Sequence, residues 1–291
     1  MRATVTKFLH AATASAGAQS SSKRRRRTAL LSALSLGCAL LATAGSARAD
    51  VMAYIGYQRG TFGTIDLNTG VVTPVGPGFV INPAGFGEIG STLYTASYGA
   101  GNLYTVDTTT GLLTLVGTGP GITYHDFGST PTSLFEADAN LQLYGINSST
   151  GAGTSVGSLS GIAFSNYRAL STNSSTLYYA SNNTLYSVND ATAAGSAIGQ
   201  FSAATNIVMT ALMLDGGTLY GADESGNFYT IDTTTGAATP DASVGNVGGA
   251  VWALAPILTT PVSPVPEPVT LAVFGTGLAC AAALRRRRKA A

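Results

Sequence analysis

Hydrophobic and polar positions alternate in short tracts along the middle of the chain, and the tracts return about every 42 residues. One tract has the form apolar-Tyr-x-Ile/Val-Asp/Asn-x-x-Thr-Gly, with looser first and fourth copies. Its acidic or amide residue recurs at spacings of 41, 40, 42 and 43, at Asp66, Asp107, Asn147, Asn189 and Asp232. A fixed period of this length predicts a repeat architecture.

A second hydrophobic tract precedes the first in each unit, so that each unit is expected to form four short strands. An apolar residue lies seven positions before the leucine of a Leu-Tyr or Leu-Phe pair, as in Phe86 and Leu93. In that unit we expect strands near Phe86 and at residues 93–96, 103–107 and 112–116. About 42 residues and four strands are typical of one blade of a β-propeller.

The two ends of the repeat region are incomplete in complementary ways. The first unit begins at its second strand, residues 52–56, and the last consists of a lone first strand, residues 251–256. We therefore expect residues 50–258 to form an all-β, five-bladed β-propeller closed by pairing the N- and C-terminal strands, which removes a free sheet edge. An open β-solenoid or a sandwich is the alternative, but neither explains the split unit.

The recurring turn and the tyrosines favour structural roles. Asp107 ends a strand and can accept N–H bonds from the turn that follows, while Gly111 can take a positive φ. A calcium loop is the alternative, but each turn offers one carboxylate where calcium takes six to eight oxygens. Stacking on carbohydrate is the alternative for the tyrosines, but packed blades bury both sheet faces, which places most of these residues in the core: Tyr94, Tyr104, Tyr144, Tyr178, Tyr186, Tyr220 and Tyr229.

The first 49 residues are typical of a signal peptide. A basic segment at residues 23–27 is followed by an apolar segment at 28–44, and Ala47 and Ala49 form an A-x-A cleavage site before Asp50. The mature chain is therefore expected to begin at Asp50.

Two other export routes stay open. Arg26 and Arg27 fit a twin-arginine signal loosely, and Cys38 could be a lipidation site, although Leu36 stands where a lipidated cysteine expects a small residue.

The last residues combine three features in a fixed order. The tetrad Val265, Pro266, Glu267 and Pro268 precedes an apolar segment at 269–284 and a basic cluster that includes Arg285, Arg286, Arg287 and Arg288. The apolar segment has 16 residues, fewer than the roughly 20 that span a bilayer, and the cluster would stay on the cytoplasmic side. Residues 259–264 are expected to be a linker and 265–291 a transmembrane sorting helix. A permanent anchor is the alternative.

These three features resemble the C-terminal signal of the PEP-CTERM proteins. The resemblance implies recognition and removal by an exosortase in a Gram-negative bacterium, with the export machinery as a further partner. It also implies a transient stay in the inner membrane, then release to the cell surface or the extracellular space. PEP-CTERM relatives are associated with exopolysaccharide and biofilm matrix, so the resemblance implies a polysaccharide partner.

Removing both terminal segments changes the charge of the chain. The whole sequence carries +1, but Arg59 and Arg168 are the only Lys or Arg residues between positions 50 and 264, where 13 of the 14 acids lie, which gives a net charge of −11. This excludes phosphate-backbone binding, so no nucleic-acid partner is expected. Both cysteines, Cys38 and Cys280, lie in the terminal segments, so we expect no disulfide, metal or cofactor in the repeat region.

Rare side chains occur at one recurring position, two residues before the apolar residue of each first strand. In propellers these strands line the central channel, so the five residues are expected at one height: Ala84, His125, Arg168, Thr210 and Trp252. Arg59, Asp223 and Glu224 lie in turns expected at the same end. We hypothesise a binding site for an anionic or sugar-like ligand, in which Arg168 and Arg59 pair with a carboxylate and Trp252 offers a stacking face. In the alternative, Trp252 packs between blades and His125 bonds to backbone or to Asp126.

No catalytic residue can be assigned. His125 could act as a general base, but the sequence holds no Gly-x-Ser-x-Gly elbow, no paired-histidine metal motif and no phosphate loop. The sequence therefore predicts an exported binding or structural module. A secreted propeller lyase or hydrolase acting on polysaccharide is the alternative.

Overall fold

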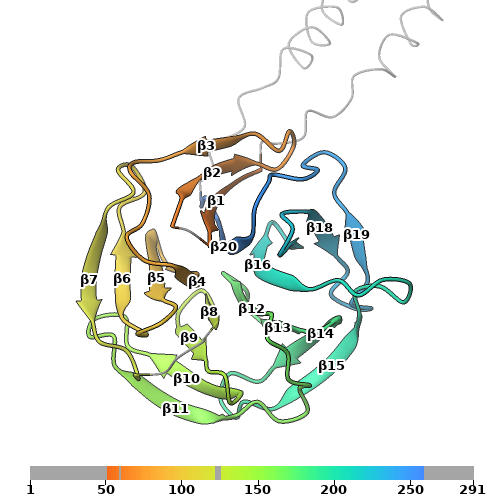
Figure 1. Ribbon diagram of the computed structural model, residues 1–291. Coiled ribbons are helices and arrows are strands. Elements are labelled where there is room, and N and C mark those ends of the chain that lie inside the picture. Colours follow the sequence, from red (N-terminus) through yellow and green to blue (C-terminus); the bar gives the residue numbers. More distant parts are fainter. Residues whose placement is uncertain (1–50, 59, 122–125, 259–291) are drawn as a thin grey trace, which may run out of the picture. The chain divides into compact units, whose positions relative to one another are not determined.

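The computed structural model describes residues 51–58, 60–121 and 126–258, and within these ranges the protein is all-β (Figure 1). They form twenty strands and no helix, so they include none that could cross a membrane. The expected signal peptide, linker and sorting helix lie outside the described residues, as do Arg59 and His125.

The strands follow one another as antiparallel meanders of four. The first sheet has the order β20 (Val251–Pro256), β1 (Met52–Tyr57), β2 (Phe62–Asp66), β3 (Val72–Pro74). The second consists of β4 (Pro83–Ile89), β5 (Thr92–Ser97), β6 (Leu103–Val106) and β7 (Leu113–Gly117). The third consists of β8 (Asp126–Ser129), β9 (Leu134–Ala137), β10 (Gln142–Ile146) and β11 (Gly153–Ser158). The strands of the second unit lie within one or two residues of those expected.

The remaining eight strands form one curled sheet made of two such meanders. One contains β12 (Arg168–Thr172), β13 (Leu177–Ser181), β14 (Thr184–Val188) and β15 (Gly195–Gln200). The other contains β16 (Met209–Asp215), β17 (Thr218–Asp223), β18 (Phe228–Ile231) and β19 (Ala238–Pro240). They are joined by a short parallel pairing of β12 with β16 at Ser171–Leu212 and Thr172–Met213.

The first strands of the meanders surround a common centre. In Figure 1, β4, β8, β12, β16 and β20 lie innermost and β3, β7, β11, β15 and β19 lie at the periphery. Each inner strand contacts its neighbours around the centre. Residues that begin these strands are thereby gathered at one end of the centre, and residues that end them at the other.

The predicted pairing of the N- and C-terminal strands is confirmed. β1 pairs antiparallel with β20 from Ala53–Pro256 to Gly56–Ala253, and the register shifts between Gly56 and Tyr57. Leu254 is 1% exposed and packs in the same hydrophobic cluster as Ile55 and Met213. The end of the repeat region is therefore part of the core.

Hydrophobic side chains fill the spaces between neighbouring sheets. Phe62, Phe79 and Phe86 form one such cluster, with ring centroids of Phe62 and Phe79 5.0 Å apart and those of Phe62 and Phe86 5.8 Å apart. The prediction that the recurring tyrosines belong to the core is confirmed for Tyr186, Tyr220 and Tyr229, which are buried. The other four are half-buried: Tyr94, Tyr104, Tyr144 and Tyr178.

The recurring Asp/Asn turn has the structural role expected of it. Oδ1 of Asp107 accepts the N–H groups of Thr109 and Thr110 at 2.9 and 3.0 Å, and Gly111 has a φ of 71°. The N–H bonds from Thr109 and Thr110 hold the pKa of the Asp107 carboxyl below its usual value. The fourth copy differs, because Ala193 rather than a glycine takes the positive φ, at 59°.

Candidate functional site

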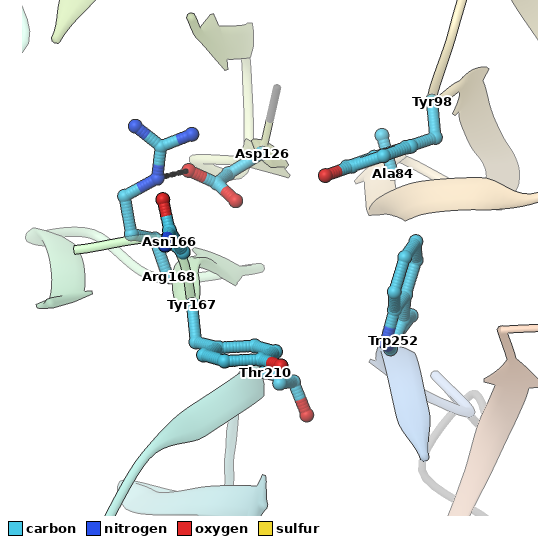
Figure 2. A pocket seen from close by; sticks show the side chains of 8 residues that line it. All are labelled: Ala84, Tyr98, Asp126, Asn166, Tyr167, Arg168, Thr210 and Trp252. Atoms are coloured by element: carbon cyan, nitrogen blue, oxygen red, sulfur yellow. Dashed lines mark ion pairs between the residues drawn. The ribbon is translucent and has the colours of Figure 1, made fainter. Parts of the chain in front are cut away.

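A small pocket lies at the end of the centre where the inner strands begin (Figure 2). Its volume is about 60 Å³, and eight residues line it: Ala84, Tyr98, Asp126, Asn166, Tyr167, Arg168, Thr210 and Trp252. Four of them are members of the recurring position singled out in the sequence, namely Ala84, Arg168, Thr210 and Trp252. The fifth, His125, lies outside the described residues.

The inner strands explain why residues so distant in sequence meet here. Arg168 is the first residue of β12, and Ala84, Thr210 and Trp252 are each second in β4, β16 and β20. Oγ1 of Thr210 donates a hydrogen bond to the carbonyl of Val251 at 2.6 Å, which ties β16 to β20 beside Trp252. Residues at equivalent positions in the repeat therefore lie at the same height around the pocket.

One side of the pocket is aromatic. The ring centroids of Tyr98 and Trp252 are 4.8 Å apart, with a tilt of 55° between the ring planes. Both side chains are half-buried, and Figure 2 shows them facing Asn166, Tyr167 and Arg168 across the pocket. Trp252 thus keeps part of its surface available, in contrast to a tryptophan fully packed between sheets.

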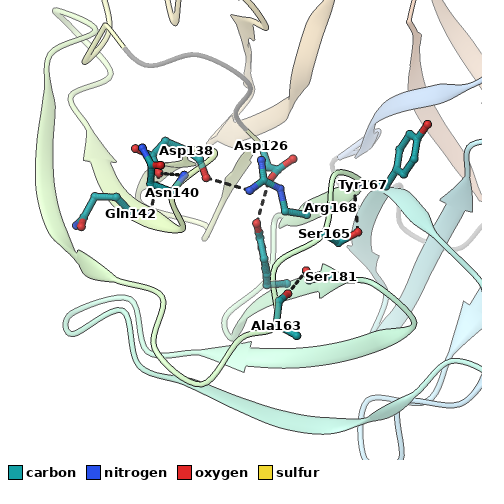
Figure 3. A network of polar contacts seen from close by, with 10 residues as sticks. Asp126, Asp138, Asn140, Gln142, Ala163, Ser165, Tyr167, Arg168 and Ser181 are labelled. Carbon is teal, nitrogen blue, oxygen red and sulfur yellow. Dashed lines mark hydrogen bonds and ion pairs between the residues drawn. The ribbon is translucent and has the colours of Figure 1, made fainter.

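The other side is polar and contains a buried ion pair. Nε of Arg168 lies 3.2 Å from Oδ2 of Asp126, and the side chains are 4% and 11% exposed. Nη1 of Arg168 donates to the carbonyl of Asp138 at 3.0 Å (Figure 3). The guanidinium carbon lies 5.6 Å from the ring centroid of Phe164. Burial is the largest single effect and lowers the Arg168 pKa, but the electrostatic effects of Asp126 and, more weakly, of Tyr179, Tyr98 and Asp138 together raise it above its usual value, so the guanidinium stays charged.

Tyr179 completes this buried group. Its hydroxyl donates to Oδ2 of Asp126 at 3.0 Å, and its side chain is fully buried. Burial and then the charge of Asp126 raise the pKa of Tyr179 well above its usual value. Asp126 is therefore held by two partners from β12 and β13, and all three side chains are fixed in place.

This arrangement changes the role expected for Arg168. The sequence hypothesis has Arg168 pairing with a ligand carboxylate, whereas in the structure the guanidinium already contacts the Asp126 carboxylate and the Asp138 carbonyl. From the sequence, Asp126 is expected only as a bonding partner of His125, because no sequence pattern links it to Arg168. The other lining residues that the sequence reasoning missed are Tyr98, Asn166 and Tyr167, which lie in connections outside the strands.

Glu224 borders the pocket indirectly. The hydroxyl of Tyr167 donates to Oε1 of Glu224 at 2.8 Å, and this bond, followed by the charge of Glu224, raises the Tyr167 pKa. Asp223 does not line the pocket. Its carboxylate accepts the N–H groups of Ser225 and Asn227 at 2.9 Å and the hydroxyl of Tyr229 at 3.0 Å. Asp223 therefore holds the turn between β17 and β18, and the ligand role expected for it is not supported by its position.

The C-terminal segment matches a known family model. Residues 264–288 match the PEP-CTERM protein-sorting motif, which confirms the resemblance carried by Val265–Pro268 and the arginine cluster. The chain is thus an exported protein with an exosortase sorting signal, which passes through a membrane-anchored intermediate. The search among curated proteins found no significant match.

Solved structures resemble the described fold only distantly. One is a chain of a nidogen/laminin complex, 13% identical, with a TM-score of 0.48 over 72% of this chain and 82% of that chain. Another is the computationally designed Ika8 protein, 14% identical, with a TM-score of 0.39 over 71% and 63%. A third is the extracellular domain of the putative one-component system BT4673 from B. thetaiotaomicron, 18% identical, with a TM-score of 0.38 over 70% and 28%.

Proposed function

We propose that this exported protein is delivered to the cell surface or extracellular matrix, where its repeat region acts as a five-bladed β-propeller that binds a neutral sugar unit. The propeller is supported by five antiparallel meanders around a common centre and by the pairing of β1 with β20. The eight-stranded sheet fits this reading, because two residues on each side make the only pairing between its halves in the described chain.

The observation that carries the proposed ligand is the two-sided pocket. A sugar ring presents C–H groups on its faces and hydroxyls at its edge. The rings of Tyr98 and Trp252 can pack against the C–H groups of a sugar face. The polar groups of Asn166, Tyr167 and the Asp126–Arg168 pair can form hydrogen bonds with the sugar hydroxyls. Aromatic surface with a few placed polar groups is the usual composition of small-molecule sites.

Charge favours a neutral ligand over an acidic one. Arg168 is the only Lys or Arg within the described ranges, and Asp126 already balances it. The segment from Asp50 to Pro264 carries a net charge of −11, which repels anions. A ligand carboxylate would enter this field without a free cation among the described residues.

The size of the pocket favours a single sugar unit. The volume of about 60 Å³ and the eight lining residues suit one sugar unit rather than several. We therefore propose that the pocket recognises a chain end or a short branch of a matrix polysaccharide. No observation favours a catalytic role, and none is proposed.

Isothermal titration calorimetry of the purified protein with neutral and uronic-acid oligosaccharides tests the proposal. We expect binding of neutral sugars that Trp252→Ala weakens about tenfold or more and Trp252→Phe weakens less, since a buried aromatic anchor commonly contributes this much. Leu115→Ala, at an exposed residue of β7, serves as the control and should leave binding unchanged. Absence of binding, or equal affinity in Trp252→Ala, would refute the sugar site, and a preference for uronic acids would refute its neutral character.

A further inference from the structure

An exposed aromatic side chain lies beside the pocket without lining it. Phe164 is 59% exposed and belongs to the connection between β11 and β12, which also supplies Asn166 and Tyr167 to the pocket. Within the described ranges, Phe164 and Tyr167 are the only Phe, Tyr or Trp residues that are exposed. Single exposed hydrophobic residues are common on protein surfaces. Here, however, both exposed aromatic residues belong to one connection, at the site where we propose that a sugar binds.

The connection that carries Phe164 is tied to the core. Ile162 is 9% exposed and belongs to a buried hydrophobic cluster. The hydroxyl of Ser181 donates to the carbonyl of Ala163 at 2.6 Å (Figure 3). The N–H of Ala163 donates to the hydroxyl of Tyr186 at 3.4 Å. The backbone directly before Phe164 is therefore fixed, which limits the positions open to its ring.

The ring of Phe164 is also oriented by a charged neighbour. The guanidinium carbon of Arg168 lies over the ring, 5.6 Å from its centroid, within the range of a cation–π contact. The guanidinium is itself held by the carboxylate of Asp126 and the carbonyl of Asp138. One face of the ring is therefore directed at a residue that lines the pocket, while more than half of the Phe164 surface stays open to solvent.

We propose that Phe164 forms a second sugar subsite, which receives the unit next to the one held in the pocket. This inference rests on the proposed function, and it assigns the ligand as an oligosaccharide end of at least two neutral units. The pocket suits one unit, so a polysaccharide end that enters it places its next unit on the surface around the pocket. Phe164 offers an aromatic surface there, against which the C–H groups of that unit can pack.

The fixed position of Phe164 favours this role. Because the connection and Arg168 already hold the ring, little side-chain freedom is lost when a ligand packs against it, and such pre-organisation raises affinity. The charge beside the ring is balanced, since Arg168 is paired with Asp126. The surroundings of Phe164 therefore suit a neutral unit, as the pocket itself does.

Isothermal titration calorimetry with sugars of one and two units tests the subsite. The probes are the methyl glycosides of glucose, galactose and mannose, and the homodisaccharides of the same three sugars in their common linkages. For the sugar that binds, we expect the disaccharide to bind about tenfold more tightly than the monosaccharide, as one well-placed aromatic contact can provide. Phe164→Ala should reduce this advantage to about twofold or less and leave the affinity for the monosaccharide unchanged.

Two further variants make the comparison specific. Phe164→Tyr keeps an aromatic face and should retain the advantage of the disaccharide. Leu112→Ala is the matched control, because Leu112 is 57% exposed and lies directly before the peripheral strand β7. It should leave both affinities unchanged.

The outcomes separate the subsite from the pocket. The subsite is overturned, and the proposed function stands, if the parent protein binds the disaccharide no more tightly than the monosaccharide, or if Phe164→Ala keeps the advantage. Equal weakening of both sugars in Phe164→Ala would also overturn the subsite, because Phe164 would then act through Arg168 and the pocket. If the parent protein binds neither sugar, the proposed function fails and the subsite fails with it.

Discussion

Arg168 and Asp126 each begin an inner strand of neighbouring meanders, β12 and β8, and their side chains form an ion pair with an Nε–Oδ2 distance of 3.2 Å. The pair joins two four-stranded units at the edge of the pocket and is almost completely buried. It therefore contributes to both the rigidity of the pocket and the cohesion of the ring of strands.

Removing the cation of this pair should destabilise the protein strongly. Arg168→Met leaves the buried carboxylate of Asp126 without its opposite charge, and breaking a buried pair on one side typically costs about 3–5 kcal/mol. Urea unfolding should show this loss. The double variant Arg168→Met with Asp126→Asn should recover part of it, because the carbonyl of the introduced amide can still accept the Tyr179 hydroxyl. A loss below about 1 kcal/mol would contradict the role given to the pair.

Strand β20, which pairs with β1, should contribute as much to the stability of the protein as any other core strand. Leu254 in β20 is 1% exposed, and Leu254→Ala should lower the free energy of unfolding by about 2–5 kcal/mol. Leu258, four residues later, is 47% exposed, so Leu258→Ala should change the free energy of unfolding by no more than about 0.5 kcal/mol. Equal effects of the two substitutions, measured by urea unfolding, would show that β20 is not part of the core.

The recurring turns allow a test in which the chain supplies its own control. Asp107→Ala removes the acceptor for the N–H groups of Thr109 and Thr110 and should lower the thermal unfolding midpoint. Asp107→Asn should leave the midpoint unchanged, because Asn147 and Asn189 accept the same bonds in the equivalent turns. If Asp107→Asn lowers the midpoint as much as Asp107→Ala, the negative charge of Asp107 stabilises the turn, rather than the ability of its oxygen to accept hydrogen bonds.

Stability should depend on pH through Glu88 in β4, which is 4% exposed. Its pKa rises from 4.5 in the unfolded chain to about 7 in the folded protein, so the folded state binds the proton more tightly. This stabilisation is complete below about pH 4.5 and is lost as the pH rises through about 7. Urea unfolding of the parent should show this fall between about pH 5 and 8, whereas Glu88→Gln should show a smaller one. An identical fall in both proteins would assign it to other groups.

The repeat period predicted much of the fold because strand position in a repeat is a local property. The tracts around Phe86, Leu93 and Leu103 each specify a short strand with a hydrophobic side, and the incomplete units at the two ends predicted the pairing of β1 with β20. The fourth turn was harder to place. Ala193 takes the conformation that a glycine has elsewhere, so a search for glycine aligns this copy two residues too late, at Gly195.

The candidate site was only partly predictable. Equal positions in the repeat predicted that Ala84, Arg168, Thr210 and Trp252 meet, because equivalent inner strands begin at the same height. The partners of Arg168 were not predictable, since ion pairs between units depend on side-chain direction and carry no periodic signal.

The intact mass of the protein recovered from the outer surface and culture medium of its native host tests the central claim, that this is an exported protein sorted through its C-terminal signal. We expect a chain that begins at Asp50 and ends near the tetrad Val265–Pro268. A chain that retains Arg285–Arg288 and is found in the inner membrane would contradict it.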